Sequence, residues 1–191
     1  IINIADLLPH PSKKQIMYKW IILCLLWTFF IISQPLWAAG NPEKGKALYA
    51  ICVACHGPDG AGNKTLNAPA IAGQEIWYLE RQLKNFKAGI RGTNSKDIYG
   101  MQMRPMAMTL VKDADLRRVV KFISTLRGAP SEPTIQGDTD AGKTAYATCA
   151  ACHGAQGAGN KALNAPRIAG QQVWYVKRQL AAFKSGIRGT H

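Results

Sequence analysis

Two short stretches decide the fold of this chain: Cys52-Val53-Ala54-Cys55-His56 and Cys149-Ala150-Ala151-Cys152-His153. Both have the form C-x-x-C-H, and they lie 97 positions apart. Sliding the chain by 97 residues aligns residues 41–94 with residues 138–191 and gives 34 identities in 54 positions. A repeat of that length indicates a duplicated domain and not a solenoid of short units.

The repeat predicts how the chain is divided. We expect a first domain at 40–127, a linker at 128–137 and a second domain at 138–191. The linker is rich in Gly, Pro and Ser, which are typical of a domain boundary. The second copy reaches His191, the counterpart of Asn94, so we expect this domain to be incomplete, as in a fragment of a longer reading frame.

Local patterns predict helices and no strands. One helix is expected to open at Asn41-Pro42-Glu43 and run toward Cys52, because a capping residue, a proline and an acid stand in the preferred order. Apolar residues at helical spacing predict two more helices, at Ile76–Ala88 and Asp113–Leu126. Each copy is therefore expected to be a small all-α domain. The apolar side chains of so small a domain form a thin core, so we expect a further group to fill its centre.

The segment before the first domain has the features of a secretory signal. We expect translation to start at Met17, an apolar run over 20–32 to follow, and cleavage to fall near Ala38 or Ala39, which makes 1–39 an upstream segment plus a signal peptide. Cys24 is interpreted as one more apolar residue of that run. The run is shorter than the ~20 residues of a spanning helix, although an uncleaved anchor is the alternative. A secretory signal of this kind predicts a periplasmic location for the protein.

Composition and charge exclude several classes of protein. The chain has 191 residues, of which 47% are apolar and 18% charged, and this excludes a disordered polyelectrolyte and a multi-span membrane protein. The formal charge is +13, and without residues 1–39 the remaining 21 Lys/Arg and 10 Asp/Glu give +11. Such a surface favours an acidic protein partner. Nucleic acid is not expected, because the chain has no basic helix and no long Lys/Arg run.

The C-x-x-C-H motif is the signature of covalent c-type haem attachment. Two thiols bond the two vinyl groups of the porphyrin, and the adjacent histidine binds the iron. We therefore expect two covalently bound haem c groups, held by Cys52, Cys55 and His56 and by Cys149, Cys152 and His153. A four-cysteine zinc site or two disulfides would leave the histidines without a role, and a thioredoxin-like pair would need a βαβ context.

A methionine-rich segment is a candidate source of the second axial ligand. Residues 99–108 hold four of the five methionines of the chain, together with Gly100 and Pro105. A thioether opposite histidine raises the potential of a haem iron. Methionine clusters are also used as core filler. We expect this segment to be a loop outside any helical stripe, with one of its methionines as a ligand.

The chain resembles the class I c-type cytochromes, and specifically the two-domain di-haem "c-four" type. The resemblance spans 41–191. It is carried by the two C-x-x-C-H-G motifs, by paired glycines at 60 and 62 and at 157 and 159, and by Pro-x-Ile-Ala-Gly-Gln at 69–74 and 166–171. It implies two tandem, cytochrome c-like helical haem domains, the second incomplete.

The resemblance also implies roles for individual residues. In that family the methionine ligand stands seven residues before a leucine that leads into the final helix, and this implies Met103, seven before Leu110, with Met106 and then Met101 as alternatives. No methionine follows Met108, so this chain offers the second haem none, and terminal His191 is not favoured as a substitute.

Other residues around the motifs have implied or open roles. The resemblance implies that the Pro69 carbonyl accepts the His56 imidazole N–H, with Ile71 close by. Pro166 is the equivalent residue in the second copy. For four aromatic residues, contact with haem and packing in the core stay equally open: Trp77, Tyr78, Trp174 and Tyr175.

These patterns predict an electron carrier and not an enzyme. The chain shows no nucleophile–base pair and no carboxylate pair, so no small-molecule substrate is expected. We expect a periplasmic di-haem cytochrome c that passes single electrons between a respiratory donor and a terminal oxidase or membrane-bound reductase with an acidic docking surface. Alternatives are a haem electron-transfer subunit of a dehydrogenase complex, and a haem enzyme or gas sensor with an open iron in the second domain.

Overall fold

The structure is a computed structural model that describes residues 13–14, 17–20, 42–128 and 136–188. Residues 41–191 form a compact unit separate from residues 1–40. Most of the expected signal peptide, its cleavage site, the capping residue Asn41, the centre of the linker and His191 lie outside the described residues. None of the described helices has both the length and the apolar character needed to cross a bilayer.

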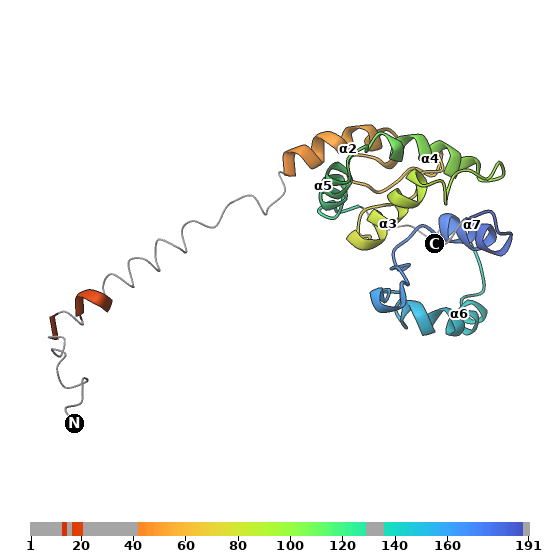
Figure 1. The fold of residues 1–191 in the computed structure, drawn as a ribbon. Coiled ribbons are helices and arrows are strands. Elements are labelled where there is room, and N and C mark those ends of the chain that lie inside the picture. The colour runs from red at the N-terminus through yellow and green to blue at the C-terminus, as the bar shows by residue number, and fades with distance from the viewer. Residues whose placement is uncertain (1–12, 15–16, 21–41, 129–135, 189–191) are drawn as a thin grey trace, which may run out of the picture. The chain divides into compact units, whose positions relative to one another are not determined.

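The described residues form helices joined by loops (Figure 1). These residues form no strands. The first domain contains α2 (Pro42–His56), α3 (Ile76–Lys87), α4 (Ile98–Met108) and α5 (Asp113–Ile123). The second contains α6 (Thr139–His153), the short 3₁₀ helix η3 (Lys161–Leu163) and α7 (Val173–Lys184). The predicted all-α class is confirmed for the described part of the chain.

The three helices predicted for the first domain are present. Pro42 is the first residue of α2, where its missing N–H costs nothing, and Glu43 lies in the first turn. Helix α3 begins at the predicted Ile76 and ends one residue before the predicted end. Helix α5 begins at the predicted Asp113 but ends at Ile123, three residues early, because the chain turns at residues 124–125.

The methionine-rich segment is helical, and the expectation of a loop is wrong. Residues 98–108 form α4, with Pro105 inside the helix. Asp97 is its N-cap, and its Oδ1 accepts a hydrogen bond from the Gly100 backbone N at 3.0 Å. Gly100 and Pro105 lower the intrinsic helix propensity, and the segment has no apolar stripe, so its sequence reads as a loop. The N-cap and the tertiary contact of α4 with α3 outweigh that propensity.

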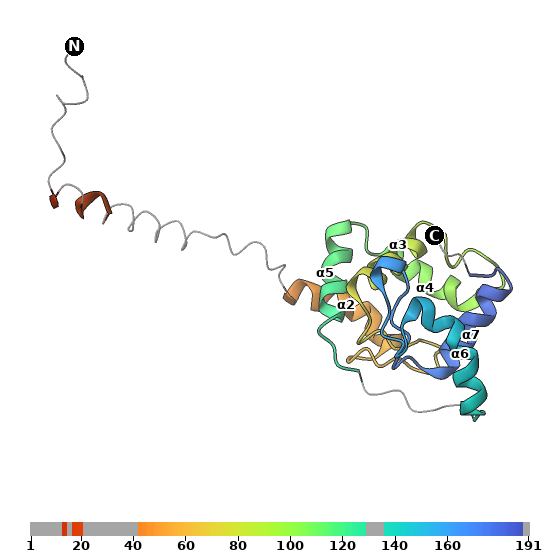
Figure 2. The same cartoon turned by 90° about the horizontal axis from the view of Figure 1, so that it is seen from below.

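The core of the first domain lies where α5 packs on α2 and α3. These helices lie side by side in both ribbon views (Figures 1 and 2). Leu116, Val119 and Val120 of α5 are fully buried, and Tyr49 of α2 is buried beside them. Gly45 of α2 allows the close approach, since a Cβ there would lie 2.6 Å from the Arg118 carbonyl oxygen of α5.

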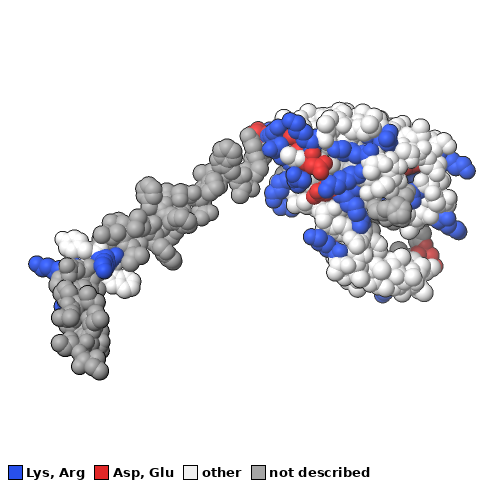
Figure 3. All heavy atoms as spheres, viewed as in Figure 1, with Lys and Arg blue, Asp and Glu red and all other residues white. Residues whose placement is uncertain are grey.

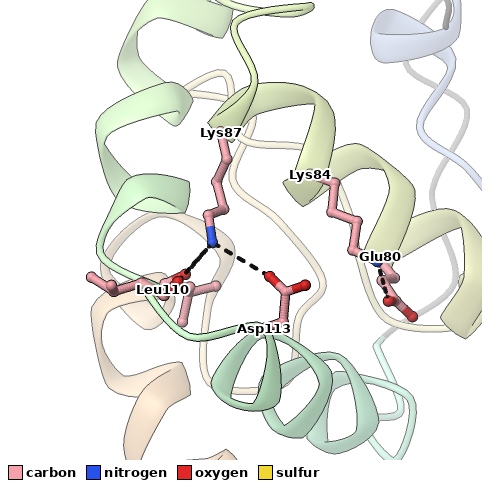
Figure 4. A network of polar contacts seen from close by, with 6 residues as sticks. Glu80, Lys84, Lys87, Leu110 and Asp113 are labelled. Carbon is pink, nitrogen blue, oxygen red and sulfur yellow. Dashed lines mark hydrogen bonds and ion pairs between the residues drawn. The ribbon is translucent and has the colours of Figure 1, made fainter.

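A lysine at the end of α3 fixes the connection between α4 and α5. Lys87 Nζ donates to the carbonyl oxygens of Leu110 at 2.6 Å and Val111 at 3.2 Å (Figure 4). It also lies 3.9 Å from Oδ1 of Asp113 in the first turn of α5. One side chain thus joins α3 to the start of α5 and to the connection that follows α4.

We expect Leu116→Ala to lower the free energy of unfolding of the haem-loaded protein by about 2–5 kcal/mol, the range for a buried leucine that leaves a cavity. Leu116 is fully buried in the core described above. The measurement is urea unfolding followed by helical circular dichroism. Val111→Ala is the control, because Val111 is 79% exposed and its loss should change the unfolding free energy by less than about 0.5 kcal/mol. Equal effects of the two substitutions would contradict the assigned core.

The second domain has far fewer buried side chains. Helices α6 and α7 contain no buried residue, and in the described part of the chain no helix packs on α6 as α5 packs on α2. Asp138 caps α6, with its Oδ1 accepting from the backbone N of Asp140 and Ala141. Local hydrogen bonds therefore contribute more to holding this domain together than the packing of apolar side chains does.

Candidate functional site

The two C-x-x-C-H motifs end equivalent helices. Cys52 and Cys55 lie one turn apart near the end of α2, and His56 is its last residue; the second motif ends α6 in the same way. Residues three apart share one face of a helix. All six predicted motif residues line a single cavity of about 1060 Å³, whose wall is formed by both domains: Cys52, Cys55, His56, Cys149, Cys152 and His153.

Each motif histidine is oriented by a proline carbonyl. His56 Nδ1 lies 2.8 Å from the Pro69 carbonyl oxygen, and His153 Nδ1 lies 2.7 Å from that of Pro166. A carbonyl only accepts, so the neutral form of each imidazole donates from Nδ1 and keeps a lone pair on Nε2. This is the tautomer that a metal-binding histidine uses, and the bond strengthens it as a ligand. The contact that the resemblance implied is present in both domains.

A tight loop places each proline carbonyl within hydrogen-bond distance of its histidine. In the first domain the Gly62 backbone N donates to the His56 carbonyl at 2.9 Å, and Ile71 N donates to the Gly60 carbonyl at 2.9 Å. Gly62 has a φ of 82°, and a Cβ there would lie 2.6 Å from the Ala68 carbonyl oxygen. Only glycine fits such an approach. The second domain repeats these bonds 97 residues later.

A tyrosine supports each motif from within its own helix, and Tyr49 is buried while Tyr146 is half-buried. Tyr49 donates from its hydroxyl to the Gly57 carbonyl at 2.6 Å, and Tyr146 donates to the Gly154 carbonyl at 2.7 Å. Burial, with smaller contributions from Cys52 and Asp59, raises the pKa of Tyr49 to about 12. The phenol therefore stays neutral and keeps donating. Each bond ties the start of the glycine loop to the helix that carries the cysteines.

Two residues of the first motif, Cys52 and His56, are uncharged at neutral pH. Burial raises the pKa of the Cys52 thiol to about 11, and the neighbouring Cys55 adds to the shift. Burial lowers the pKa of His56, and the hydrogen bond to Pro69 opposes part of that effect. His56 is thus a neutral imidazole, which can bind a metal, beside a neutral Cys52 thiol, which can form a thioether.

Helix α4 presents two of its four methionines to the cavity. Met103 and Met106 line it, whereas Met101 and Met108 do not and are exposed. Helical spacing explains the division: 103 and 106 share one face, while 101 and 108 share the opposite one. Met101, the third alternative, therefore lies away from the site. Met103 and Met106 both stay candidates by position.

The four aromatic residues whose roles were open divide by position. Tyr78 and Tyr175 line the cavity, whereas Trp77 and Trp174 are not among its lining residues. Each tryptophan ring instead lies against an arginine, Arg81 at 4.9 Å and its counterpart Arg178 at 4.8 Å from the ring centroids. The tyrosines belong to the site, and the tryptophans lie against two of the arginines that line it.

The two domains meet through hydrogen bonds that repeat the internal symmetry of the sequence. Arg178 donates to the Asn67 carbonyl at 2.9 Å and to its Oδ1 at 3.0 Å. The equivalent Arg81 donates to the Asn164 carbonyl at 3.2 Å and to its Oδ1 at 3.4 Å. Gln172 and Gln171 of the second domain likewise bond the backbone of Ala70 in the first. Each domain thus binds the glycine loop of the other.

Sequence reasoning missed this set of arginines. Both copies contain Arg-Gln-Leu, at 81–83 and 178–180, and Gly-Ile-Arg-Gly-Thr, at 89–93 and 186–190. Exact repetition of polar residues in a duplicated domain is a signal that could have pointed to them. What each arginine contacts is decided by tertiary structure, because its partners lie about a hundred residues away.

We expect Arg178→Ala to destabilise the protein by about 1.5–3 kcal/mol, the range for hydrogen bonds made by a charged group. The equivalent substitution Arg81→Ala is the matched control and should cost less, because its bonds are longer and exposed. Denaturant unfolding of both haem-loaded variants checks this order. A larger loss for Arg81→Ala would contradict the interface described here.

The residues around the cavity fit a haem in each domain. The cavity wall is largely apolar, with Leu79, Phe86 and Ile123 among its residues, and holds two cysteines and one oriented histidine per domain. Its volume of about 1060 Å³ lies just above the roughly 300–1,000 Å³ range of single ligand sites, which fits two sites that join. Among the described residues no group of three or more His, Cys, Asp or Glu forms an alternative metal centre.

Comparison with known proteins gives matches that cover both copies of the repeat. The family model for cytochrome c matches residues 42–127 and 139–191. Cytochrome c4 of Azotobacter vinelandii is 33% identical over 165 residues, which cover 79% of this chain and 76% of that protein. A thiosulfate dehydrogenase electron acceptor of Thiomonas intermedia is 31% identical, over 90% of this chain and 78% of that one. The crystal structure of reduced recombinant cytochrome c4 from Pseudomonas stutzeri matches with a TM-score of 0.63 and 30% identity, over 78% of this chain and 83% of that one.

Proposed function

This chain belongs to the cytochrome c family and is a di-haem cytochrome c4-like electron carrier, and we propose on that basis that it binds one haem c covalently in each domain. The observation that carries the proposal is the paired geometry of the motifs. In both domains two cysteines and a histidine with its proton on Nδ1 face one cavity.

The residues have separate tasks in this function. Cys52 and Cys55 hold the first haem and Cys149 and Cys152 the second, while the proline-oriented histidines supply the iron ligands. Haem supplies the reversible one-electron chemistry, and the protein supplies ligands, burial and docking charge. We assign Met103 as the sixth ligand of the first haem, because it lines the cavity and is half-buried.

The partners we propose are redox proteins with acidic docking surfaces, such as a terminal oxidase or a membrane-bound reductase. Figure 3 shows Lys and Arg side chains distributed over one face of the helical part of the chain, where acidic side chains are few. A positive surface steers an acidic partner toward contact. The apolar run and small residues before position 40 support export to the periplasm.

We expect the rate of electron exchange with such a partner to fall by about tenfold or more between 10 mM and 500 mM salt, because the Debye length shrinks from about 30 Å to a few ångströms. Stopped-flow reduction of the loaded protein by candidate donors measures this rate. A neutral small-molecule reductant is the control and should show little salt dependence. A protein donor whose rate is independent of salt would contradict electrostatic docking.

A second candidate function is the electron-accepting subunit of a dehydrogenase complex. The similarity to a thiosulfate dehydrogenase electron acceptor favours it. The two functions differ in the lifetime of the complex that this chain forms with its redox partner. Co-purification of a catalytic subunit at physiological salt would support the subunit, whereas a complex that dissociates on dilution would support a free carrier.

A further inference from the structure

Arg178 of the second domain contacts two different segments of the first domain. Its side chain extends from α7. One nitrogen of its guanidinium donates to the Asn67 carbonyl oxygen at 2.9 Å, and another donates to Oδ1 of the same residue at 3.0 Å. The guanidinium carbon also lies 4.2 Å from the centroid of the Tyr99 ring. Arginine suits this position, because its planar group donates along its edge while its face stacks on an aromatic ring.

The first of these segments orients the histidine of the first motif. Asn67 stands two residues before Pro69, whose carbonyl oxygen lies 2.8 Å from Nδ1 of His56. Asn67 has a φ of 55°, a left-handed conformation that residues other than glycine keep only where surrounding contacts hold them. The two bonds from Arg178 are such contacts. Arg178 therefore supports the loop that fixes the His56 imidazole.

The second segment carries the methionine that we assign as the sixth ligand. Tyr99 lies in the first turn of α4, and Met103 follows one turn later on the same face. Both residues line the cavity. Pro105 inside α4 removes one hydrogen bond of that helix, so the position of α4 depends more on contacts made by its side chains. The Tyr99 ring adds a contact with the second domain to the packing of α4 on α3.

The guanidinium of Arg178 is itself held in place from several sides. Two rings of α7 lie near it, Trp174 at 4.8 Å and Tyr175 at 5.5 Å from their centroids. Burial lowers the pKa of Arg178, whereas the two tyrosines near it and Asp97 oppose that shift. A cation among aromatic rings, near the carboxylate that caps α4, is attracted to both kinds of group. It can therefore act as a fixed link between the segments that it contacts.

We propose that Arg178 is a positioning residue for the iron of the first haem. It joins the loop that orients His56 to the helix that carries Met103, and it makes sulfur ligation in the first domain depend on the second domain. The proposal rests on the proposed function, which puts a haem in this cavity. We call this set of contacts, made by Arg178 with Asn67 and Tyr99, the Arg178 clamp.

The internal repeat contains a natural contrast to the clamp. Arg81 is the equivalent residue of the first domain, and its bonds to Asn164 are longer, at 3.2 and 3.4 Å. The rings near its guanidinium, Trp77 at 4.9 Å and Tyr78 at 5.5 Å, belong to its own domain. In the part of the chain that the structure describes, Arg81 thus contacts the loop of the other domain and no ring of that domain.

The test is a titration of the oxidised, haem-loaded whole protein with imidazole, followed by the loss of the spectrum of the iron–sulfur bond. Imidazole competes with the thioether for the iron, so its apparent affinity measures how firmly α4 holds the methionine. We expect Arg178→Ala to raise this affinity by about tenfold, because it removes the ring contact together with two hydrogen bonds of a charged group.

Matched variants show which contact matters. Tyr99→Leu should raise the imidazole affinity by about fivefold, the size of one cation–π contact. Tyr99→Phe keeps the ring and should keep the wild-type affinity. Lys177→Ala removes a positive charge from an exposed neighbouring position of α7 outside the cavity, and should leave the affinity unchanged. Arg81→Ala should change it less than Arg178→Ala does.

A double variant separates the clamp from a general stabilising role. If Arg178 acts on α4 through Tyr99, then Arg178→Ala combined with Tyr99→Leu should match Arg178→Ala alone, at about tenfold. A rise of about fiftyfold, the product of two independent effects, would overturn the clamp. An effect of Arg178→Ala no larger than that of Arg81→Ala or Lys177→Ala would overturn it as well. Should Arg178→Ala fail to accumulate, the comparison of Tyr99→Leu with Tyr99→Phe gives the same test.

The premise has a separate readout. Haem staining of denatured wild type counts the covalent haems, and fewer than two would overturn the proposed function. Two covalent haems without a sulfur-ligand spectrum would leave that function standing and would overturn the clamp, because α4 would then carry no ligand for Arg178 to position.

Discussion

Cys52→Ala combined with Cys55→Ala is expected to reduce the covalent haem content from two groups per chain to one. The two thiols lie one turn apart on α2 and line the cavity, and a thioether bond is the link that survives denaturation. Intact-mass measurement and haem staining after denaturing electrophoresis give the count. The effect is all-or-none for that site, which makes it the largest change expected of any substitution in this chain.

The duplicated domain supplies a matched control for this experiment. Cys149→Ala with Cys152→Ala should also leave one haem, but it should leave the haem of the first domain, with the spectrum of the Met103 ligand. Two covalent haems in either double variant would contradict the assignment. The first double variant should also unfold more easily than the second, because the haem site that it removes borders the core formed by α2, α3 and α5.

Met103→Ala is expected to remove the sulfur ligand from the first haem and lower its potential. The low-spin histidine–methionine spectrum of one haem should disappear. The fall in potential should be on the order of 100 mV or more, since the choice of axial ligand spans about 0.8 V. Absorption spectra and a redox titration of the loaded protein measure both changes.

The neighbouring methionines make this prediction selective. Met101→Ala and Met108→Ala are controls that should leave the spectrum unchanged, because both side chains face away from the cavity. Met106→Ala is the discriminating variant, since Met106 lies one helical turn from Met103 on the same face. If Met106→Ala removes the spectrum and Met103→Ala does not, the ligand is Met106.

The sequence by itself determined the class of fold and the chemistry of the site. A motif such as C-x-x-C-H is local: three side chains within five residues of one helix contain most of the information about the cofactor that we propose for them. The helix signals of α2, α3 and α5 are local as well, since capping residues and apolar spacing act within a few turns. Because the chain repeats at an offset of 97, the inference from the motif applies to both copies.

Tertiary structure alone decided where distant segments meet. The helix α4 forms in a segment whose Gly100 and Pro105 predict a loop, because its N-cap and its packing on α3 outweigh local propensity. That helix in turn divides the methionines into two faces. The pairing of Arg178 with Asn67, and the burial of Arg91 beside Arg188, join residues about a hundred positions apart. Such contacts depend on the geometry of the whole fold, and no local pattern contains them.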